Sequence, residues 1–436
     1  MSFKRYPAYK DSGVEWLGDI PSHWSVIPLA KIALEPGSLF IDGDWVESKD
    51  LSDQGIRYIT TGNVGEGKYK EQGSGYISQA KFDELRCTEV LPGDVLISRL
   101  NLPIGRACVV PDLGERIITS VDNVITRPDS GYSCSYLAYM LSSASHFANM
   151  EVLARGTTMQ RISRSTLGQV RFSFPPLDEQ TAIATFLDHE TAKIDALVAE
   201  QEKLITLLQE KRQAVISHAV TKGLNPNAPM KDSGVEWLGE VPEHWEVGAV
   251  KRFFSSLDSR RVPLSSEERS AKQGDFAYYG ASGVIDSIDE YIFDEDLVLV
   301  SEDGANLLSR VTPIAFVATG KYWVNNHAHI LKPIDANVRF WAERIEALEL
   351  APVITGSAQP KLTIEALMNL VIAVPSTAEE RASISSYIQL ESEKLDALLI
   401  QARTAITLLQ ERRTALISAA VTGQIDVRNW SAQESV

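Results

Sequence analysis

Lys10-Asp-Ser-Gly-Val-Glu-Trp-Leu-Gly18 recurs letter for letter as Lys231-Asp-Ser-Gly-Val-Glu-Trp-Leu-Gly239. This match continues at a constant offset of 221 residues, and a second match at an offset of 201 joins residues 179–221 to residues 380–422. The chain is therefore an internal duplication, in which each copy has an entry segment, a globular stretch and a long helix. The offsets differ because the first globular stretch is 20 residues longer. The copies therefore share the entry segment and the long helix, and they differ in the globular stretch between them.

The long helix is the clearest predicted element of each copy. Residues 178–221 contain no Gly or Pro, and they lie between Pro176 and Gly223. Apolar residues alternate at spacings of four and three, which predicts a helix that packs against a helical partner. In the second copy Thr377 and Glu380 predict a capping box. The apolar stripe consists of Ile183, Leu187, Ile194, Leu197, Leu204, Leu208 and Val215 in the first copy, and of Ile384, Ile388, Leu395, Leu398, Ala402, Ala405, Leu409 and Leu416 in the second.

Polar residues that interrupt the stripe also repeat. Glu190 corresponds to Glu391, and Lys211 corresponds to Arg412. If the two helices pack antiparallel, each acid lies toward the basic residue near the end of the other helix. The alternative is that all four are solvated positions on a helix face.

Between the entry segment and the helix, each copy changes to short β-rich runs separated by Gly, Pro and Asn. These runs predict strands, and two longer stretches predict helices at 136–153 and 338–350. Each globular stretch is therefore expected to be a mixed α and β domain, which gives the fold class α+β. The predicted strands cover 56–60, 94–98, 107–110 and 122–126 in the first copy, and 291–293, 297–300, 314–317 and 329–331 in the second.

These changes along the chain predict its domain boundaries. The predicted segments are the first entry segment (1–31), the first globular domain (32–173), the first long helix (174–222), a linker with the second entry segment (223–252), the second globular domain (253–372), the second long helix (373–425) and a tail (426–436).

Composition limits the class of protein. With 436 residues, 44% of them apolar, the chain is expected to form two to four domains with real cores. No apolar run reaches membrane-spanning length and the start lacks the apolar core of a signal peptide, so we expect a cytoplasmic protein with no membrane partner. The three cysteines indicate neither a disulfide framework nor a zinc site. A net charge of -16 argues against non-specific binding to nucleic acid, so any DNA binding by the chain alone is expected to be weak or local.

The sequence contains no recognisable catalytic constellation. Residues 62–68 match most of a phosphate-binding loop, but Tyr69 occupies the place of the Ser or Thr that would hold magnesium, and no helix can follow. A turn between strands is expected instead. His327 and His329 have a spacing that suits a metal, but without nearby Cys or carboxylate ligands we expect a half-buried or surface pair. We predict no enzymatic activity, no cofactor and no metal site.

Taken in order, these features resemble the specificity subunit of Type I restriction-modification systems over nearly the whole chain. The resemblance is carried by the two entry segments, by the exit motif Gly156-Thr-Thr-Met-Gln-Arg-Ile162, and by Pro175-Pro-Leu-Asp-Glu-Gln180 with the helix that follows. Tyr278-Tyr-Gly-Ala-Ser-Gly283 and Arg57-Tyr-Ile-Thr-Thr-Gly-Asn63 look like parts of target recognition domains. The second exit motif, Gly356-Ser-Ala-Gln-Pro-Lys-Leu362, is one residue shorter between Gly and Gln, and Arg381 replaces Gln180.

The resemblance implies a non-catalytic subunit whose two target recognition domains each recognise one half of a bipartite, asymmetric sequence in double-stranded DNA. It also implies two long antiparallel, coiled-coil-like helices between the domains, with pseudo-two-fold symmetry. Two methyltransferase subunits would dock on the repeated elements, and restriction subunits carrying the endonuclease would join them. Because a helix of about 43 residues is roughly 65 Å long, it can separate two DNA-binding modules by a helical turn of duplex or more.

The acidic net charge fits this assignment, because the methyltransferase partners would supply much of the phosphate contact. Polar and basic loop residues are the candidates for base contact, since Arg and Asn or Gln suit bidentate contact with guanine and adenine edges. A purely structural role is the alternative for each, and Tyr278 and Tyr279 in particular suit a core. The candidates are Arg57, Thr61, Asn63, Lys68, Arg99, Asn101, Arg106, Thr157, Gln160 and Arg161 in the first domain, and Arg260, Arg261, Tyr278, Tyr279, Ser282, Asn306, Arg310, Asn325, Asn326 and Lys361 in the second.

Two other functions remain open at the level of sequence. The first is a non-catalytic coiled-coil scaffold whose globular domains bind proteins or glycans instead of DNA. The second is a chain that is itself a methyltransferase or nuclease, which the missing motifs disfavour.

Overall fold

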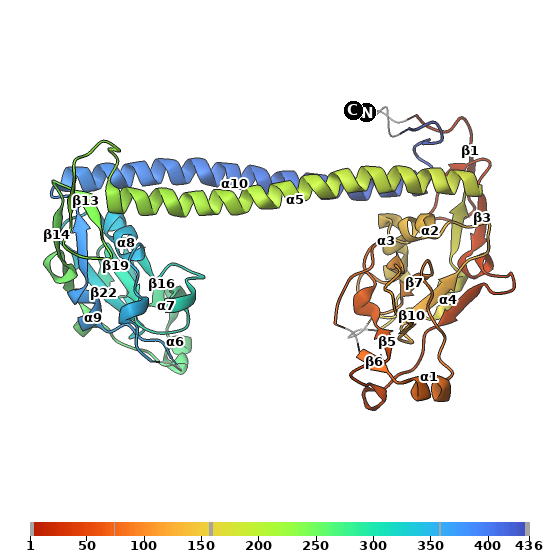
Figure 1. The fold of residues 1–436 in the computed structure, drawn as a ribbon, viewed down its shortest axis with the longest axis horizontal. Helices are drawn as coiled ribbons and strands as arrows, with labels where there is room; N and C mark the ends of the chain where they lie inside the picture. The colour runs from red at the N-terminus through yellow and green to blue at the C-terminus, as the bar shows by residue number, and fades with distance from the viewer. Residues whose placement is uncertain (1–3, 74, 157–159, 357–358, 432–436) are drawn as a thin grey trace. The chain divides into compact units, whose positions relative to one another are not determined.

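The computed structural model describes residues 4–73, 75–156, 160–356 and 359–431. The chain divides into two compact units, one made of Met1–Gln201 with Thr404–Val436 and the other of Glu202–Arg403 (Figure 1). Each unit therefore contains one globular domain, the start of one long helix and the end of the other. The duplication in the sequence is thus a duplication of structure.

In the first unit the entry segment forms a hairpin of β1 (Tyr9–Asp11) and β2 (Asp19–Pro21), and β3 (Ser25–Pro28) pairs with β11 (Arg171–Phe174). A four-stranded antiparallel sheet has the order β4 (Leu39–Asp42), β10 (Asn123–Arg127), β7 (Val95–Ser98), β8 (Ala107–Val109). A three-stranded sheet has the order β6 (Gly75–Ile77), β5 (Ile56–Ile59), β9 (Ile117–Thr119). The α-helices are α1 (Gln79–Leu85), α2 (Cys134–Met140), α3 (Ala144–Leu153) and α4 (Arg164–Gln169).

The second unit repeats this plan with β12 (Met230–Asp232) and β13 (Glu240–Pro242), and with β14 (Glu246–Ala249) against β23 (Val371–Val374). Its first sheet has the order β15 (Phe254–Ser256), β22 (Ala328–Pro333), β19 (Leu297–Ser301), β20 (Ala315–Ala318). Its other sheet differs, with the order β17 (Gly283–Ile288), β16 (Gln273–Gly280), β21 (Lys321–Val324), β18 (Phe293–Asp294). The α-helices are α6 (Ser266–Ala271), α7 (Asn306–Ser309), α8 (Val338–Glu346) and α9 (Ile364–Asn369).

The central strands β7 and β19 of the four-stranded sheets are buried on both faces, which explains their nearly continuous apolar residues. In β7, Val95 and Ile97 belong to the core that includes α2, whereas Leu96 belongs to the core beneath the three-stranded sheet. In β19, Val298 and Leu299 are divided in the same way between two cores. Each globular domain is therefore a layered α+β structure, as the fold class predicts.

The long helices α5 (Leu177–Lys222) and α10 (Ala378–Val421) confirm the predicted helices. In the first unit Ile183 and Leu187 of α5 share a core with Ile417 and Val421 of α10. In the second unit Ile384 and Ile388 of α10 share a core with Ile216 and Val220 of α5. Within each unit the start of one helix thus packs on the end of the other, which is antiparallel pairing.

The predicted stripe is correct at the helix starts and again at Leu208, Leu395 and Ala402, and it is wrong at three leucines. Leu197, Leu204 and Leu398 are exposed, at 45%, 41% and 46% of their surface, whereas Leu395 packs with Leu208. The reason is geometric: a straight helix with 3.6 residues per turn drifts away from a strict seven-residue repeat. These three leucines therefore lie outside the buried seam.

Ion pairs between the two long helices do form, but not between the residues predicted, which were Glu190 and Glu391 with Lys211 and Arg412. Glu190 and Glu391 each contact a lysine three positions along their own helix, at 3.3 and 2.6 Å. The pairs between helices are instead Arg212–Asp396 at 2.6 Å in the second unit and Asp195–Arg413 at 3.3 Å in the first. The two pairs use equivalent residues of the duplication, so both units have the same helix register.

The predicted helix at 136–153 is two helices, α2 and α3. Ser143 ends the gap between them, and its side chain accepts a hydrogen bond from the amide of His146, which caps α3. The predicted helix at 338–350 ends at Glu346. All eight predicted strands are present within a few residues.

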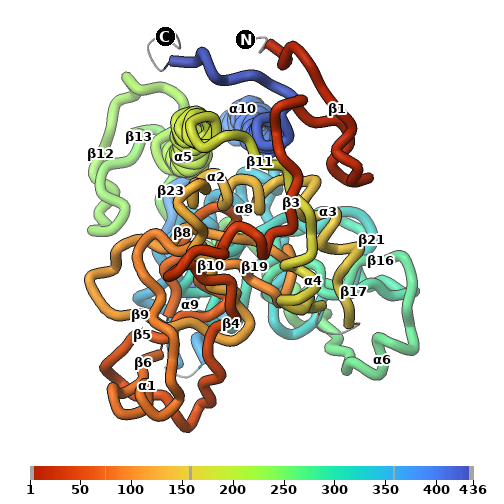
Figure 2. Tube along the Cα trace, turned by 90° about the vertical axis from the view of Figure 1, so that its right-hand side faces the viewer, coloured from red at the N-terminus to blue at the C-terminus, as the bar shows by residue number. Residues whose placement is uncertain are grey.

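The N-terminal and C-terminal segments pack together in the first unit (Figure 2). The amide of Asp426 donates to the carbonyl of Lys4 at 2.8 Å, and Trp430 lies edge-on to Phe186 of α5. Among the helices of the described ranges, none is long and apolar enough to cross a membrane.

Candidate nucleic-acid interface

The repeated His-Trp pair of the entry segment has a structural role. In the first unit the Glu179 carboxylate, at the start of α5, accepts from Trp24 Nε1 at 3.0 Å and Tyr6 Oη at 2.6 Å, and contacts His23 Nε2 at 2.7 Å. Burial, followed by the neighbouring carboxylate, raises the pKa of Tyr6 well above its usual range. The entry segment is thereby fastened to the start of the long helix.

The second unit repeats this arrangement with one donor fewer. Glu380 accepts from Trp245 Nε1 at 3.1 Å and contacts His244 Nε2 at 2.9 Å. Thr377 Oγ1 accepts from the Glu380 amide at 3.2 Å, so half of the predicted capping box forms. The Glu380 side chain is used for the entry segment instead of the cap.

These two carboxylates predict unequal effects on stability. Glu179→Ala leaves buried donors of Trp24 and Tyr6 without an acceptor and should cost about 2–4 kcal/mol of the free energy of unfolding. Glu380→Ala is the matched control, and because the Glu380 side chain is more exposed it should cost about 1–2 kcal/mol. Urea unfolding followed by circular dichroism measures both. A larger loss for Glu380→Ala would contradict this account.

In each unit, the loop that follows β7 or β19 of the four-stranded sheet meets the exit motif. Ile162 donates its amide to the Arg99 carbonyl at 3.1 Å, and Leu362 donates to the Glu302 carbonyl at 2.8 Å. Arg161 and Lys361 each form a β-bridge with this loop, to Leu100 and Asp303 respectively. Arg99 and Glu302 are therefore equivalent positions, as are Arg161 and Lys361.

In the first unit this region is rich in arginine. Arg99 contacts Asp42 at 3.1 Å, Arg164 contacts the same carboxylate at 3.5 Å, and Arg161 contacts Asp122 at 2.7 Å. Arg99 is buried, and burial lowers the pKa of its guanidinium while Asp42 opposes that shift.

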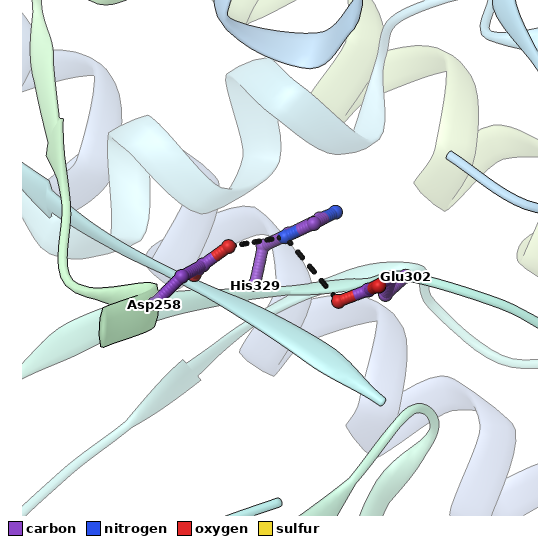
Figure 3. A group of neighbouring side chains, drawn as sticks. All are labelled: Asp258, Glu302 and His329. Atoms are coloured by element: carbon purple, nitrogen blue, oxygen red, sulfur yellow. Dashed lines mark hydrogen bonds and ion pairs between the residues drawn. The ribbon is translucent and has the colours of Figure 1, made fainter. Parts of the chain in front are cut away.

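In the second unit the same region is built around two acids and a histidine (Figure 3). His329 Nδ1 lies 2.6 Å from Asp258 and 3.7 Å from Glu302, and its Nε2 lies 2.9 Å from the carbonyl of Leu362. Lys361 contacts Glu302 at 3.1 Å, and Arg261 contacts both acids. Burial raises the pKa of Glu302, but the hydrogen bonds from Arg261 and Lys361 outweigh it, and the net shift is downward.

This cluster could supply three metal ligands, since its ligand atoms lie within 4.8 Å of one another. Arg261 and Lys361 already engage the two oxygens of Glu302, and His329 engages Asp258. The arrangement is thus a charge-balanced ion-pair cluster and fits a cation poorly. The expected half-buried or surface pair is right for His327, which is exposed, and wrong for His329, which is buried. Both histidines also have carboxylates nearby, against expectation, since His327 contacts Asp303 at 2.8 Å and His329 contacts Asp258.

The structure sorts the predicted contact residues by exposure. Six are buried with internal partners: Arg57, Asn63, Arg99, Arg106, Tyr278 and Asn325. Five are half-buried: Thr61, Arg261, Tyr279, Asn306 and Arg310. Eight are exposed: Lys68, Asn101, Gln160, Arg161, Arg260, Ser282, Asn326 and Lys361. Thr157 lies outside the described residues.

The internal partners show what the buried members do. Arg106 donates to the carbonyls of Val64, Thr61 and Asn101 at 2.7–2.9 Å, and so ties two loops together. The Asn63 side chain accepts from the amide of Thr60, the capping residue of a 3-10 turn after β5, at 3.0 Å, which confirms a turn where the phosphate-loop pattern occurs. Tyr278 Oη accepts from the Leu264 amide at 3.0 Å. These residues organise the loops that carry the exposed candidates.

Sequence reasoning missed Asp42, Asp122, Asp258 and Glu302 as members of these clusters. Asp42 lies on β4 and Asp258 just after β15, far in sequence from the exit motifs that they approach. No local pattern signals such a meeting, because it depends on strand order.

Comparison with known proteins gives the same assignment twice along the chain. A family model described as Type I restriction modification DNA specificity domain matches residues 37–206 and again residues 242–401. The putative type I restriction enzyme MjaX specificity subunit of Methanocaldococcus jannaschii is 23% identical over 265 residues, which is 59% of each chain. The MjaIX specificity subunit of that organism is 22% identical over 98% of each chain.

Solved structures agree on the fold. One described as the structural basis of complex assembly and conformational transition of the type I R-M system has a TM-score of 0.61 at 15% identity, over 92% of this chain and 98% of that one. The HsdS subunit from Thermoanaerobacter tengcongensis has a TM-score of 0.52, also at 15% identity, over 93% and 98%.

Proposed function

This chain belongs to the family of Type I restriction-modification specificity subunits, and from that premise we propose that it recognises a bipartite, asymmetric target in double-stranded DNA. It is a non-catalytic member with two target recognition domains, matched at 37–206 and 242–401. Each domain contacts one half of the target, chiefly through the exposed and half-buried candidates named above.

One observation carries this proposal: the two units keep the same four-stranded sheet but surround it with different parts. The second sheet has three strands in the first unit and four in the second, and the buried position of Arg99 in the first unit is occupied by Glu302 in the second. Different loops on a common sheet suit two domains that bind different bases. A scaffold that binds the same protein or glycan twice would be expected to keep its binding residues the same.

The partners of this proposal are two methyltransferase subunits, with restriction subunits joining them. Its support is that exposed apolar residues on the long helices repeat: Leu197 and Leu398 are equivalent, and so are Leu207 and Leu408. Exposed leucines contribute nothing to the core of this chain and suit contact with a partner. Because they occur twice, they suit two copies of the same partner.

Co-expression with the cognate methyltransferase subunit tests this proposal. We expect a stable complex with two methyltransferase subunits per chain, and methylation of plasmid DNA only when both proteins are present. Leu197→Ser with Leu398→Ser should weaken the complex, and Val152→Ser, at an exposed apolar site on α3, is the matched control. A chain that neither retains the methyltransferase nor supports methylation would refute the proposal and favour the scaffold.

A further inference from the structure

Arg161 and Lys361 occupy equivalent positions that have kept a positive charge. Each directly precedes the residue, Ile162 or Leu362, whose amide donates to the loop after β7 or β19. Arg161 exchanges backbone hydrogen bonds with Arg155, and Lys361 does so with Thr355. Their side chains are 46% and 51% exposed. A cation therefore stands at the same place on the surface of each recognition domain.

The acid that pairs with this cation comes from a different position in each unit. Arg161 is held by Asp122 at 2.7 Å, and Lys361 is held by Glu302 at 3.1 Å. These acids are not equivalent: Glu302 corresponds to Arg99, and Asp122 corresponds to His327, since the amides of Arg99 and Glu302 donate to the carbonyls of Asp122 and His327. Both units have a cation at this position although its acidic partner comes from a different position in each unit. The internal ion pair alone therefore does not explain why the charge is repeated.

The ion pairs leave both cations available. Asp122 also interacts electrostatically with Arg99, and Glu302 has Arg261 as a second cation, so neither acid depends wholly on the exposed residue. A ligand anion can therefore share or replace the carboxylate. The chain has a net charge of -16, so an exposed cation that is repeated in both units stands out. Such a cation suits contact with the DNA phosphates, which are the same whatever the base sequence.

We propose that Arg161 and Lys361 are equivalent phosphate contacts, which position each recognition domain on the duplex whatever its sequence, while the differing neighbours discriminate bases. This inference rests on the proposed DNA-binding function. Arg in one unit and Lys in the other is consistent with it, because both bind phosphate and differ chiefly in their geometry toward bases.

The test uses the complex of this chain with its methyltransferase subunits and two duplexes of equal length, one carrying the motif that it methylates and one unrelated. Arg161→Ala and Lys361→Ala should each weaken binding to both duplexes by a similar factor, about tenfold, and lower the salt-dependence slope by about one. Arg161→Lys and Lys361→Arg should bind as the unsubstituted complex does. Asp122→Asn, which frees Arg161, should strengthen binding to both duplexes.

Arg155→Ala is the matched control, because Arg155 is an exposed arginine beside Arg161 whose equivalent, Thr355, is neutral. It should change binding by less than about threefold, since the repeated cation is retained. Loss confined to the motif duplex would make Arg161 or Lys361 a base contact and overturn the inference. Equal losses for Arg155→Ala and Arg161→Ala would overturn it as well. An unsubstituted complex that binds neither duplex would overturn the proposed function itself.

Discussion

Exchanging the first recognition domain for that of a relative should change one half of the methylated motif and leave the other half intact. The domain predicted at 32–173 has its own sheets and two cores of its own, and it shares its third core with segments of the first unit, so new loops can be accommodated without altering the second unit. The joint is best placed before β11, because β11 pairs with β3 of the entry segment. Replacing residues 32–170 therefore keeps that pair.

The matched control replaces residues 253–370 in the second unit, again ending before the strand that pairs with the entry region. It should change the other half of the motif. Methylation mapping of cells that express each hybrid measures the outcome, and each hybrid should lose all methylation at the original motif, the largest effect possible. A hybrid in which both halves change would contradict independent recognition by the two domains.

Lengthening the long helices should lengthen the spacer between the two half-sites. α5 runs without interruption for 46 residues, about 69 Å at 1.5 Å per residue. One heptad inserted after Leu204, together with one after Thr404 in α10, leaves the ion pairs Arg212–Asp396 and Asp195–Arg413 within their own units. Seven residues add about 10.5 Å, which corresponds to about three base pairs of duplex.

The motif of the lengthened chain is obtained by the same methylation mapping. We expect the two half-sites unchanged and the spacer longer by about three base pairs, with the original motif no longer methylated. As the control, a chain with seven residues substituted instead of inserted should keep the original spacer. Insertion with an unchanged spacer would mean that helix length does not set the separation.

The long helices and the strands of the shared sheet could be predicted because their signals are local. Residues 178–221 have a helical period without Gly or Pro, and strands such as β7 and β19 are continuous apolar runs buried on both faces. One prediction from a local pattern was wrong, and the structure shows why. The helix expected at 136–153 is interrupted because Ser143 caps a new helix in place of continuing the first.

The functional clusters could be predicted only in part. Arg161 and Lys361 stand out in the sequence because they belong to repeated exit motifs. Their partners Asp122 and Glu302 do not, since strand pairing alone brings them to the same edge. The burial of Arg99 and Arg106 could not be foreseen either, because each guanidinium is surrounded by loop carbonyls from distant segments.

A base-resolution methylation map of the host genome, with and without this chain, tests whether the chain selects the methylated sequence. We expect one bipartite, asymmetric motif with a methylated base in each half, present only when the chain is present. Methylation that persists without the chain, or a single continuous motif, would contradict it.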